Sequence, residues 1–173
     1  ALASIEGIRL IGGGATRQQS VRAALEALTD APPARVLIHD AARPDLPTSV
    51  VDRLLSALGS HPAAIPVLAV VDSMALASGG LMTAQVGRQD LRRVQTPQAF
   101  RFAEVLAAHR AWAGPATAVD DAQVARAAGL AVALVDGDER LLKLTFAADF
   151  RTSSAMVRIG TGYDVHRLAA GEE

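Results

Sequence analysis

Residues suited to metal and phosphate chemistry follow an apolar run in the segment HDAARP (residues 39–44). Asp40 ends the run, Ala41 is small, and Arg43 precedes a proline that stiffens the turn. A carboxylate can hold a metal–phosphate group, and a guanidinium can bind phosphate through two hydrogen bonds. The same two charges could instead form an ion pair that only fixes the loop. His39 fits a packed strand residue better than a catalytic group.

A glycine-rich turn, GGGATRQQS (residues 12–20), leads into a helical pattern with Ser20 in its first turn. Backbone N–H groups in such turns bind anions or the edges of bases. Gly14, Ala15 and Ser20 are therefore candidates for nucleotide contact. The turn lacks the lysine of a phosphate-binding loop and the full glycine spacing of a dinucleotide site. An ordinary turn between a strand and a helix is the alternative.

Two segments further along the chain carry more phosphate-binding residue types. VDSMA (71–75) again places an aspartate after a strand, and Ser73 could donate to a phosphate or simply cap a turn. VGRQDLRRVQTPQAF (86–100) holds three arginines, among them Arg88, and places Thr96 between two glutamines. These guanidinium groups could bind phosphate, or they could form a solvated basic face.

Lys143 is the only lysine among the 17 lysine and arginine residues of the chain. An ammonium is a compact point charge that a guanidinium does not replace. In LLKLT (141–145), which we expect to be a strand, Lys143 needs an anion or an exit to water. Lys143 could instead protect an edge strand from pairing with another chain. A composition biased toward arginine could also leave a single lysine without any function.

Near the end of the chain, YDVHR (163–167) places Asp164 and His166 two residues apart. In a strand both side chains leave the same face, as two ligands of one divalent ion would. A zinc site needs three or four ligands, so these two do not complete one.

Composition limits the classes of function. The net charge of −1 gives no indication of a nucleic-acid partner, and the absence of cysteine excludes disulfide and thiolate chemistry. No apolar run approaches the ~20 residues that span a bilayer, and no signal peptide is evident. We expect no membrane association and a cytoplasmic protein.

Strands and helices alternate along the chain and would position these residues. We expect strands over 5–11, 35–40, 63–72, 131–137 and 141–145. We expect helices over 17–28, 49–59, 97–112 and 121–128, with Thr48 and Asp120 as caps. Residues 81–87 and 92–96 could form an antiparallel pair or arm. This alternation predicts an α/β fold, Rossmann-like, with a mostly parallel sheet, helices on both faces and ligands beyond the carboxyl ends of the strands.

Taken in order, GGGATRQQSV, HDAARP, VDS, GRQDLRRVQTPQAF, VDDA and LLKLT resemble the 2-C-methyl-D-erythritol 4-phosphate cytidylyltransferases over about residues 5–153. The resemblance implies a nucleotidyltransferase fold, magnesium as cofactor, and transfer of CMP from CTP to the sugar phosphate with release of pyrophosphate. RIGTGYDVHRL (158–168) resembles the start of the zinc-dependent 2-C-methyl-D-erythritol 2,4-cyclodiphosphate synthases of the same isoprenoid pathway, and some bacteria fuse the two enzymes.

This resemblance also implies a domain organisation and an assembly. We expect a transferase domain over 1–153, a linker over 154–157 and the start of a cyclase (a lyase) over 158–173, in a chain truncated at both ends. The family's transferase usually dimerises through an arm, here about residues 74–96, so we expect a homo-oligomer.

The roles of single residues follow from the same resemblance. The nucleotide would be bound by Gly14, Ala15, Ser20, Asp40 and Ala41, with Asp40 near the magnesium–phosphate group. The methylerythritol phosphate would be held by Arg43, Ser73, Arg88 and Thr96. Lys143 would steady the transferring phosphate, and we take Lys143, Arg88 and Ser73 as the catalytic set. Asp164 and His166 match two of three zinc ligands.

Several positions depart from the family's usual pattern. Ala15 replaces a common aspartate, Ala75 a lysine, Val119 a threonine and Leu141 an asparagine. The family's opening glycine-rich loop, which grips the triphosphate, has no counterpart in the sequence. Two alternatives therefore remain: a non-catalytic nucleotide-binding or assembly module, and a related sugar-nucleotide pyrophosphorylase.

Overall fold

The computed structural model describes residues 7–145 and residue 149. The chain divides into two units, residues 1–142 and 143–173. All helices and strands named below belong to the first unit. The expected linker and cyclase segment, with Asp164 and His166, lie outside the described residues.

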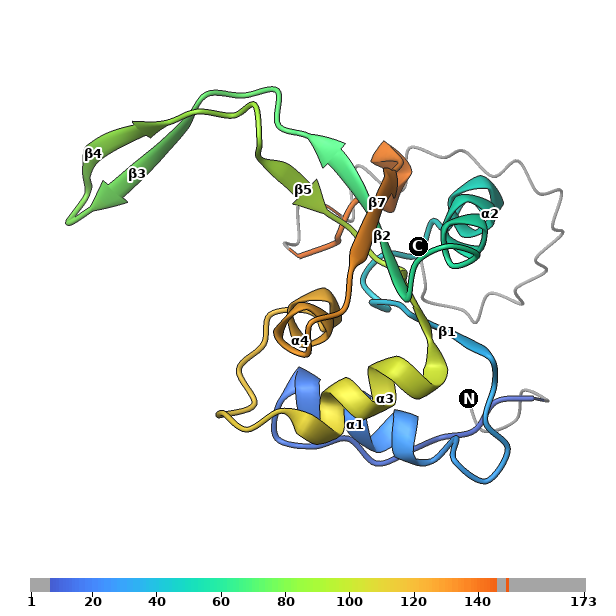
Figure 1. The fold of residues 1–173 in the computed structure, drawn as a ribbon. Helices are drawn as coiled ribbons and strands as arrows, with labels where there is room; N and C mark the ends of the chain where they lie inside the picture. The colour runs from blue at the N-terminus through green and yellow to red at the C-terminus, as the bar shows by residue number, and fades with distance from the viewer. Residues whose placement is uncertain (1–6, 146–148, 150–173) are drawn as a thin grey trace, which may run out of the picture. The chain divides into compact units, whose positions relative to one another are not determined.

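A mixed sheet forms the centre of the first unit (Figure 1). Its strands lie in the order β1 (Arg35–Ile38), β6 (Gln98–Arg101), β2 (Ala63–Ala69) and β5 (Arg92–Val94), with β7 (Val132–Asp136) also paired to β2. β7 runs parallel to β2, whereas β6 is antiparallel to β1 and β2, and β5 is antiparallel to β2. The expected α/β class is confirmed, and β5 and β6 run against the common direction of β1, β2 and β7.

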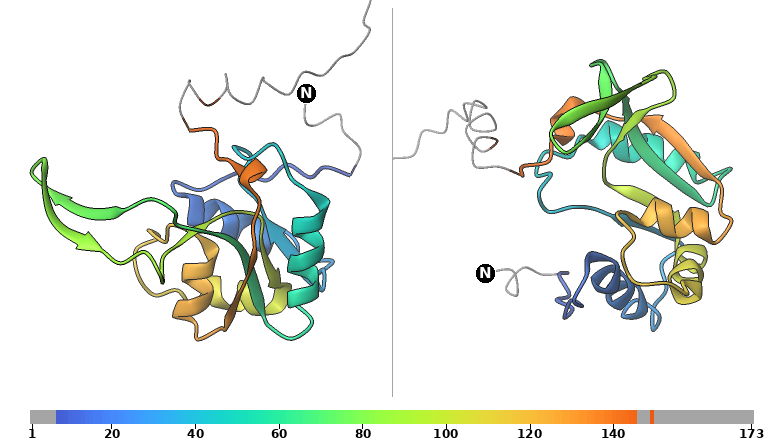
Figure 2. Two further views of the ribbon diagram at one scale, coloured as in Figure 1. Left: turned by 90° about the horizontal axis from the view of Figure 1, so that it is seen from above. Right: turned by 90° about the vertical axis from the view of Figure 1, so that its left-hand side faces the viewer.

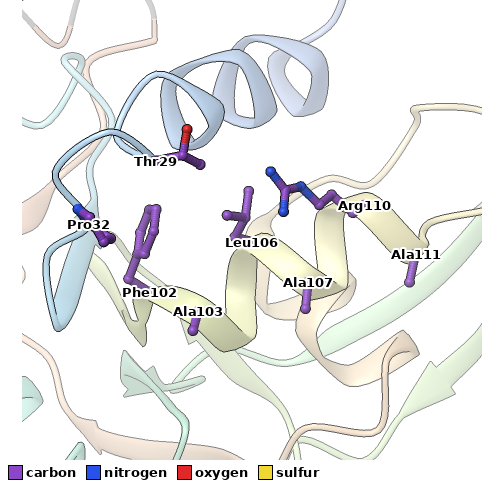
Figure 3. A pocket seen from close by; sticks show the side chains of 8 residues that line it. All are labelled: Thr29, Pro32, Phe102, Ala103, Leu106, Ala107, Arg110 and Ala111. Atoms are coloured by element: carbon purple, nitrogen blue, oxygen red, sulfur yellow. The ribbon is translucent and has the colours of Figure 1, made fainter.

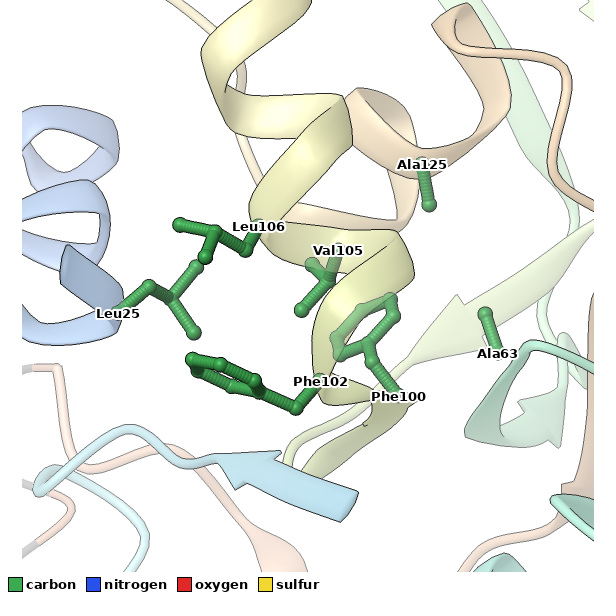
Figure 4. Close-up of a cluster of buried hydrophobic side chains, with 7 residues drawn as sticks. All are labelled: Leu25, Ala63, Phe100, Phe102, Val105, Leu106 and Ala125. Atoms are coloured by element: carbon green, nitrogen blue, oxygen red, sulfur yellow. The ribbon is translucent and has the colours of Figure 1, made fainter. Parts of the chain in front are cut away.

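Helices cover both faces of this sheet, as expected. On one face lies α4 (Asp121–Ala127) with α3 (Phe102–Ala111), and α1 (Arg17–Glu26) packs against α3; on the other face lies α2 (Thr48–Ala57). The paired residues Ala63 and Phe100 face the first group of helices (Figure 4), and the next pair, Ala64 and Ala99, faces α2. Alternation along β2 and β6 therefore divides the core into two layers.

A hairpin of β3 (Met74–Ser78) and β4 (Leu81–Val86) projects from the sheet as an arm (Figures 1 and 2). Its turn is Gly79-Gly80, and both glycines have positive φ, as the tight turns of twisted hairpins require. Residues 81–87 and 92–96 were expected to form an antiparallel pair or an arm. The pairing of these two segments with each other is wrong, whereas residues 81–86 do belong to an arm. Residues 81–86 pair with β3, and residues 92–94 join the main sheet as β5.

Four further sequence predictions are corrected. Residues 7–11 form no strand, and the side chains of Ile8, Leu10 and Ile11 are exposed because no described strand pairs with them. Residues 97–112 are not one helix. Residues 98–101 form β6, since they pair with both β1 and β2, and α3 begins at Phe102.

The segment 141–145 is not a strand. Leu141 ends a short 3₁₀ turn (Glu139–Leu141) and is fully buried against α2, while Leu142 is exposed. Among the predicted caps, Asp120 does cap α4, because its side chain accepts the N–H of Gln123. Thr48 does not cap α2. It is the first residue of that helix, whose N-cap position is Pro47, with no side-chain hydrogen bond.

Candidate functional site

The glycine turn is held closed by the first turn of α1. Gly14 donates its N–H to Ser20 Oγ at 3.0 Å, and that hydroxyl donates to the carbonyl of Thr16, also at 3.0 Å. Because a serine hydroxyl has one hydrogen and two lone pairs, Ser20 retains one acceptor position for a ligand. Ala15 is exposed beside it. The turn therefore brings Gly14 and Ser20 into contact, with Ala15 next to Gly14 along the chain.

The end of β1 is fixed by Thr96. Thr96 Oγ1 accepts the N–H of Asp40 at 3.0 Å and lies 3.2 Å from His39 Nδ1. His39 Nε2 lies 2.9 Å from the carbonyl of Arg43, which can only accept, so in the neutral ring Nε2 carries the hydrogen and Nδ1 accepts from Thr96. His39 thus holds the loop together, and the hydroxyl hydrogen of Thr96 is committed to it.

Arg43 lies in the same loop. Its N–H donates to the carbonyl of Asp40 at 2.9 Å, and its Nη1 donates to the carbonyl of Leu141. Its Nε is buried and has no hydrogen-bond partner among the described residues. Burial lowers the pKa of Arg43, an effect that the charge of Asp40 opposes. A buried guanidinium N–H without a partner is a ready donor for a phosphate oxygen.

Arg17 joins the glycine turn to the end of β1. Its Nε lies 3.6 Å from Asp40 Oδ1, and its Nη2 lies 2.8 Å from Asp121 Oδ2. Burial alone lowers the pKa of Arg17, but the hydrogen bond and charge of Asp121, and then Asp40, raise it overall. Sequence reasoning did not select Arg17. A signal was present, because a cation in the first turn of a helix opposes the helix dipole and needs acidic partners.

Two buried glutamines fix the Gln95–Gln98 segment, in which the Thr96–Pro97 peptide bond is cis. Gln95 exchanges two hydrogen bonds with the backbone of Asp138, at 2.8 and 3.0 Å. Gln98 accepts the N–H groups of Asp121 and Ala122 and donates to Asp120. Because β6, α4 and the loop after β7 are tied to this segment, Thr96 is held rigidly opposite Asp40.

Ser73 and Arg88 form a second group at the base of the arm. Ser73 immediately precedes β3 and is exposed. Arg88 follows β4 and donates to the carbonyl of Val71. Both candidates thus occupy the junction between the sheet and the projecting hairpin.

Lys143 belongs to the second unit, where its side chain is exposed and its carbonyl lies 3.4 Å from Thr145 Oγ1. Its assignment to the transferring phosphate stays a prediction, as do the zinc ligands Asp164 and His166. An open apolar cavity of about 630 Å³ lies along α3 (Figure 3), lined by residues such as Phe102, Leu106 and Arg110. None of the candidate site residues lines it.

The chain is similar to proteins that are already known. Residues 1–159 match the family "IspD: 2-C-methyl-D-erythritol 4-phosphate cytidylyltransferase". The chain is 62% identical over its whole length to a bifunctional enzyme IspD/IspF of Novosphingobium aromaticivorans and 59% identical to that of Erythrobacter litoralis. It spans 45% of the length of each, slightly less than half.

The fold is also similar to a solved structure. The 2-C-methyl-D-erythritol 4-phosphate cytidylyltransferase of Thermus thermophilus superposes with a TM-score of 0.75 at 36% identity, covering 90% of this chain and 80% of that one. In the described part of the chain, no helix has the length and apolarity to cross a membrane. From the family match, the chain belongs to the IspD family of 2-C-methyl-D-erythritol 4-phosphate cytidylyltransferases.

Proposed function

We propose that the protein containing this chain transfers CMP from CTP to 2-C-methyl-D-erythritol 4-phosphate and releases pyrophosphate. The observation that carries the proposal is the contact of Arg17 with Asp40. It joins the candidate nucleotide turn, at the start of α1, to the candidate metal–phosphate carboxylate at the end of β1. The family match and the relatives named above support the same reaction.

The nucleotide would occupy the edge formed by the glycine turn and the HDAARP loop. Gly14, Ala15 and Ser20 would contact the base, and Ala41 would let the nucleotide approach the backbone. Asp40 fits a magnesium site, because magnesium is commonly held by one or two carboxylates together with substrate phosphates and water. When bound, the ion would neutralise charge on the triphosphate.

The sugar phosphate would be held by basic and hydroxyl groups. Arg43 offers a buried Nε–H without a partner in the described residues. Ser73 and Arg88 would act from the base of the arm, and Thr96 would act by holding the loop that carries Asp40 and Arg43. The phosphate of this substrate attacks the α-phosphorus of CTP, and pyrophosphate leaves. Such a displacement depends on positioning and charge neutralisation, with Lys143 at the transferring phosphate.

A second activity belongs to the same proposal. The relatives are described as bifunctional IspD/IspF enzymes, and the motif at 158–168 resembles the start of a cyclodiphosphate synthase. We assign residues 1–153 to the transferase, 154–157 to a linker and 158–173 to the start of a cyclase with Asp164 and His166 as zinc ligands. The proposal also includes a homo-oligomer that pairs through the arm, on which Leu76, Leu81 and Met82 are exposed. It further includes a cytoplasmic location.

The decisive experiment measures pyrophosphate release from CTP and methylerythritol phosphate by the full-length protein and its Lys143→Ala variant. Release that requires both substrates and collapses in the variant is the expected result. Arg126→Ala, an exposed cation on α4, serves as the matched control. An unchanged rate in Lys143→Ala would remove Lys143 from the site.

The same assay separates the two other functions that the sequence left open. Binding of CTP without turnover would identify a nucleotide-binding module, the reading that Ala15, Ala75 and Leu141 favour. Activity with another nucleotide and sugar phosphate would identify a sugar-nucleotide pyrophosphorylase. Either outcome would overturn the proposed reaction.

A further inference from the structure

A continuous series of polar contacts leads from Asp40 into the protein core. Arg17 Nε lies 3.6 Å from Asp40 Oδ1, Arg17 Nη2 lies 2.8 Å from Asp121 Oδ2, and Asp121 Oδ1 lies 3.1 Å from His109 Nε2. The four residues come from the end of β1, α1, α4 and α3. The reaction proposed above uses only Asp40, so the other three need a separate explanation.

The inner end of this series is buried and rigid. The Asp121 and His109 side chains are 1% and 0% exposed, respectively, and the backbone N–H of Asp121 is bonded to the fully buried Gln98. A buried carboxylate is stable only when hydrogen bonds and an opposite charge compensate its desolvation. His109 supplies one hydrogen bond and Arg17 supplies the charge. Asp121 is therefore a fixed anchor for the Arg17 guanidinium.

Arg17 uses different nitrogens for its two acidic partners. Nη2 is directed to Asp121 and Nε to Asp40, so one planar group is held between two carboxylates. A lysine, with a single nitrogen, does not reproduce this geometry. Since Thr96 fixes the backbone of Asp40, Arg17 is placed to fix its carboxylate.

We infer that Arg17 is a positioning residue that, anchored by Asp121 and His109, orients the Asp40 carboxylate toward the metal–phosphate group of CTP. This inference rests on the function proposed above. It assigns a role to an arginine, an aspartate and a histidine that do not touch the substrate. It also explains why a cation stands in the first turn of α1, where the helix dipole disfavours it.

The test uses the full-length protein and the variants Arg17→Met, Arg17→Lys and Asp121→Asn. We expect Arg17→Met to lower kcat by about 10- to 100-fold with little change in the KM for CTP, because a misoriented carboxylate impairs the reacting geometry. The Kd for magnesium in the presence of CTP, measured by calorimetry, should rise. Arg17→Lys should restore only part of kcat. The control is Arg22→Met on the same helix, whose side chain is 49% exposed beside Glu26.

A double-mutant cycle separates positioning from general stability. Asp121→Asn removes the negative charge that faces Arg17, so it should also lower kcat. If Arg17 acts through its Asp121 anchor, the double variant should be no slower than Arg17→Met alone. Melting temperatures identify a variant that fails to fold. If Arg17→Met does not fold, the values of kcat are compared among wild type, Arg17→Lys and Asp121→Asn.

The outcomes are distinct. Arg17→Met within about twofold of the wild-type kcat, with an unchanged Kd for magnesium, overturns the inference and leaves the proposed function standing. Additive losses in kcat for Arg17→Met and Asp121→Asn also overturn it. A wild-type protein that releases no pyrophosphate overturns the proposed function and this inference together.

Discussion

Thr96 continues the pairing of two strands beyond the point where their backbone hydrogen bonds end. The β1–β6 register finishes at Ile38 and Gln98, and the next contact is the N–H of Asp40 with Thr96 Oγ1 at 3.0 Å. A side chain thus replaces the backbone at the edge of the sheet. The backbone of Asp40, which carries the candidate metal–phosphate carboxylate, is therefore held by a hydroxyl from a segment 56 residues away.

Thr96→Val should impair both stability and turnover. Valine keeps the shape of threonine but leaves the N–H of Asp40 without its acceptor, which costs about 1–3 kcal/mol of unfolding free energy. We expect kcat for pyrophosphate release to fall about tenfold as the loop shifts. Thr96→Ser should retain both, and Thr117→Val, in the exposed loop before α4, should change neither. Normal kcat in Thr96→Val would contradict this role.

Gln98→Leu should destabilise the first unit more than any exposed glutamine change. Gln98 is fully buried. At the start of α4, it accepts hydrogen bonds from the N–H groups of Asp121 and Ala122 and donates one to the Asp120 side chain. Removing its amide leaves these groups without their partner, for an expected loss of about 2–4 kcal/mol. Urea unfolding measures the loss. A substitution at an exposed site usually changes the free energy of unfolding by no more than about 0.5 kcal/mol, so a loss that small in Gln98→Leu would refute the argument.

Candidate residues at the ends of strands could be predicted from the sequence, because polar residue types there directly follow an apolar run. Asp40 follows an apolar run that forms β1, so its position at the carboxyl end of a strand could be predicted. The glycine turn was expected at the end of a strand over 5–11, and no strand forms over the described residues 7–11. The structure adds that Arg17 makes the connection. Arg17, Asp40 and Asp121 lie far apart in the sequence. The periodic patterns of a short segment therefore do not predict that they meet.

The incorrect predictions share another cause. Gln98–Arg101 continues directly into α3, so its apolar residues fit a helical pattern, and only pairing with β1 and β2 makes it a strand. Conversely, residues 7–11 alternate like a strand but have no strand partner among the described residues. Whether a segment forms a strand depends on the strands beside it as well as on its own sequence. The sequence of the segment alone does not identify those neighbours.

Gly14→Ala should disturb the candidate nucleotide turn, whereas Gly12→Ala should not. A Cβ at Gly14 would stand 2.4 Å from Cβ of Gln19, while one at Gly12 would meet nothing within 4 Å. Displacing Gln19 breaks its 3.2 Å bond to the N–H of Thr16, part of the capping box that begins α1. We expect the Kd for CTP to rise about tenfold and stability to fall by about 1 kcal/mol. Calorimetry of both variants checks this, and equal affinities would exclude the turn from the nucleotide site.

Asp138 should make stability depend on pH in the acid range. Its carboxylate accepts hydrogen bonds from the Arg140 side chain and backbone, which lower its pKa from 3.8 to about 2. A group whose pKa is lower in the folded state stabilises the fold above its unfolded pKa. That stabilisation is lost as the pH falls through the folded value.

The wild type should therefore exceed Asp138→Asn in unfolding free energy by a constant margin between about pH 5 and 8, and the margin should close between pH 3.8 and about 2. Urea unfolding at a series of pH values measures the margin. Asp30→Asn, in the exposed turn after α1, is the control for the loss of one carboxylate. A margin that persists in full at about pH 2 would show that the Asp138–Arg140 pair does not act through its charge.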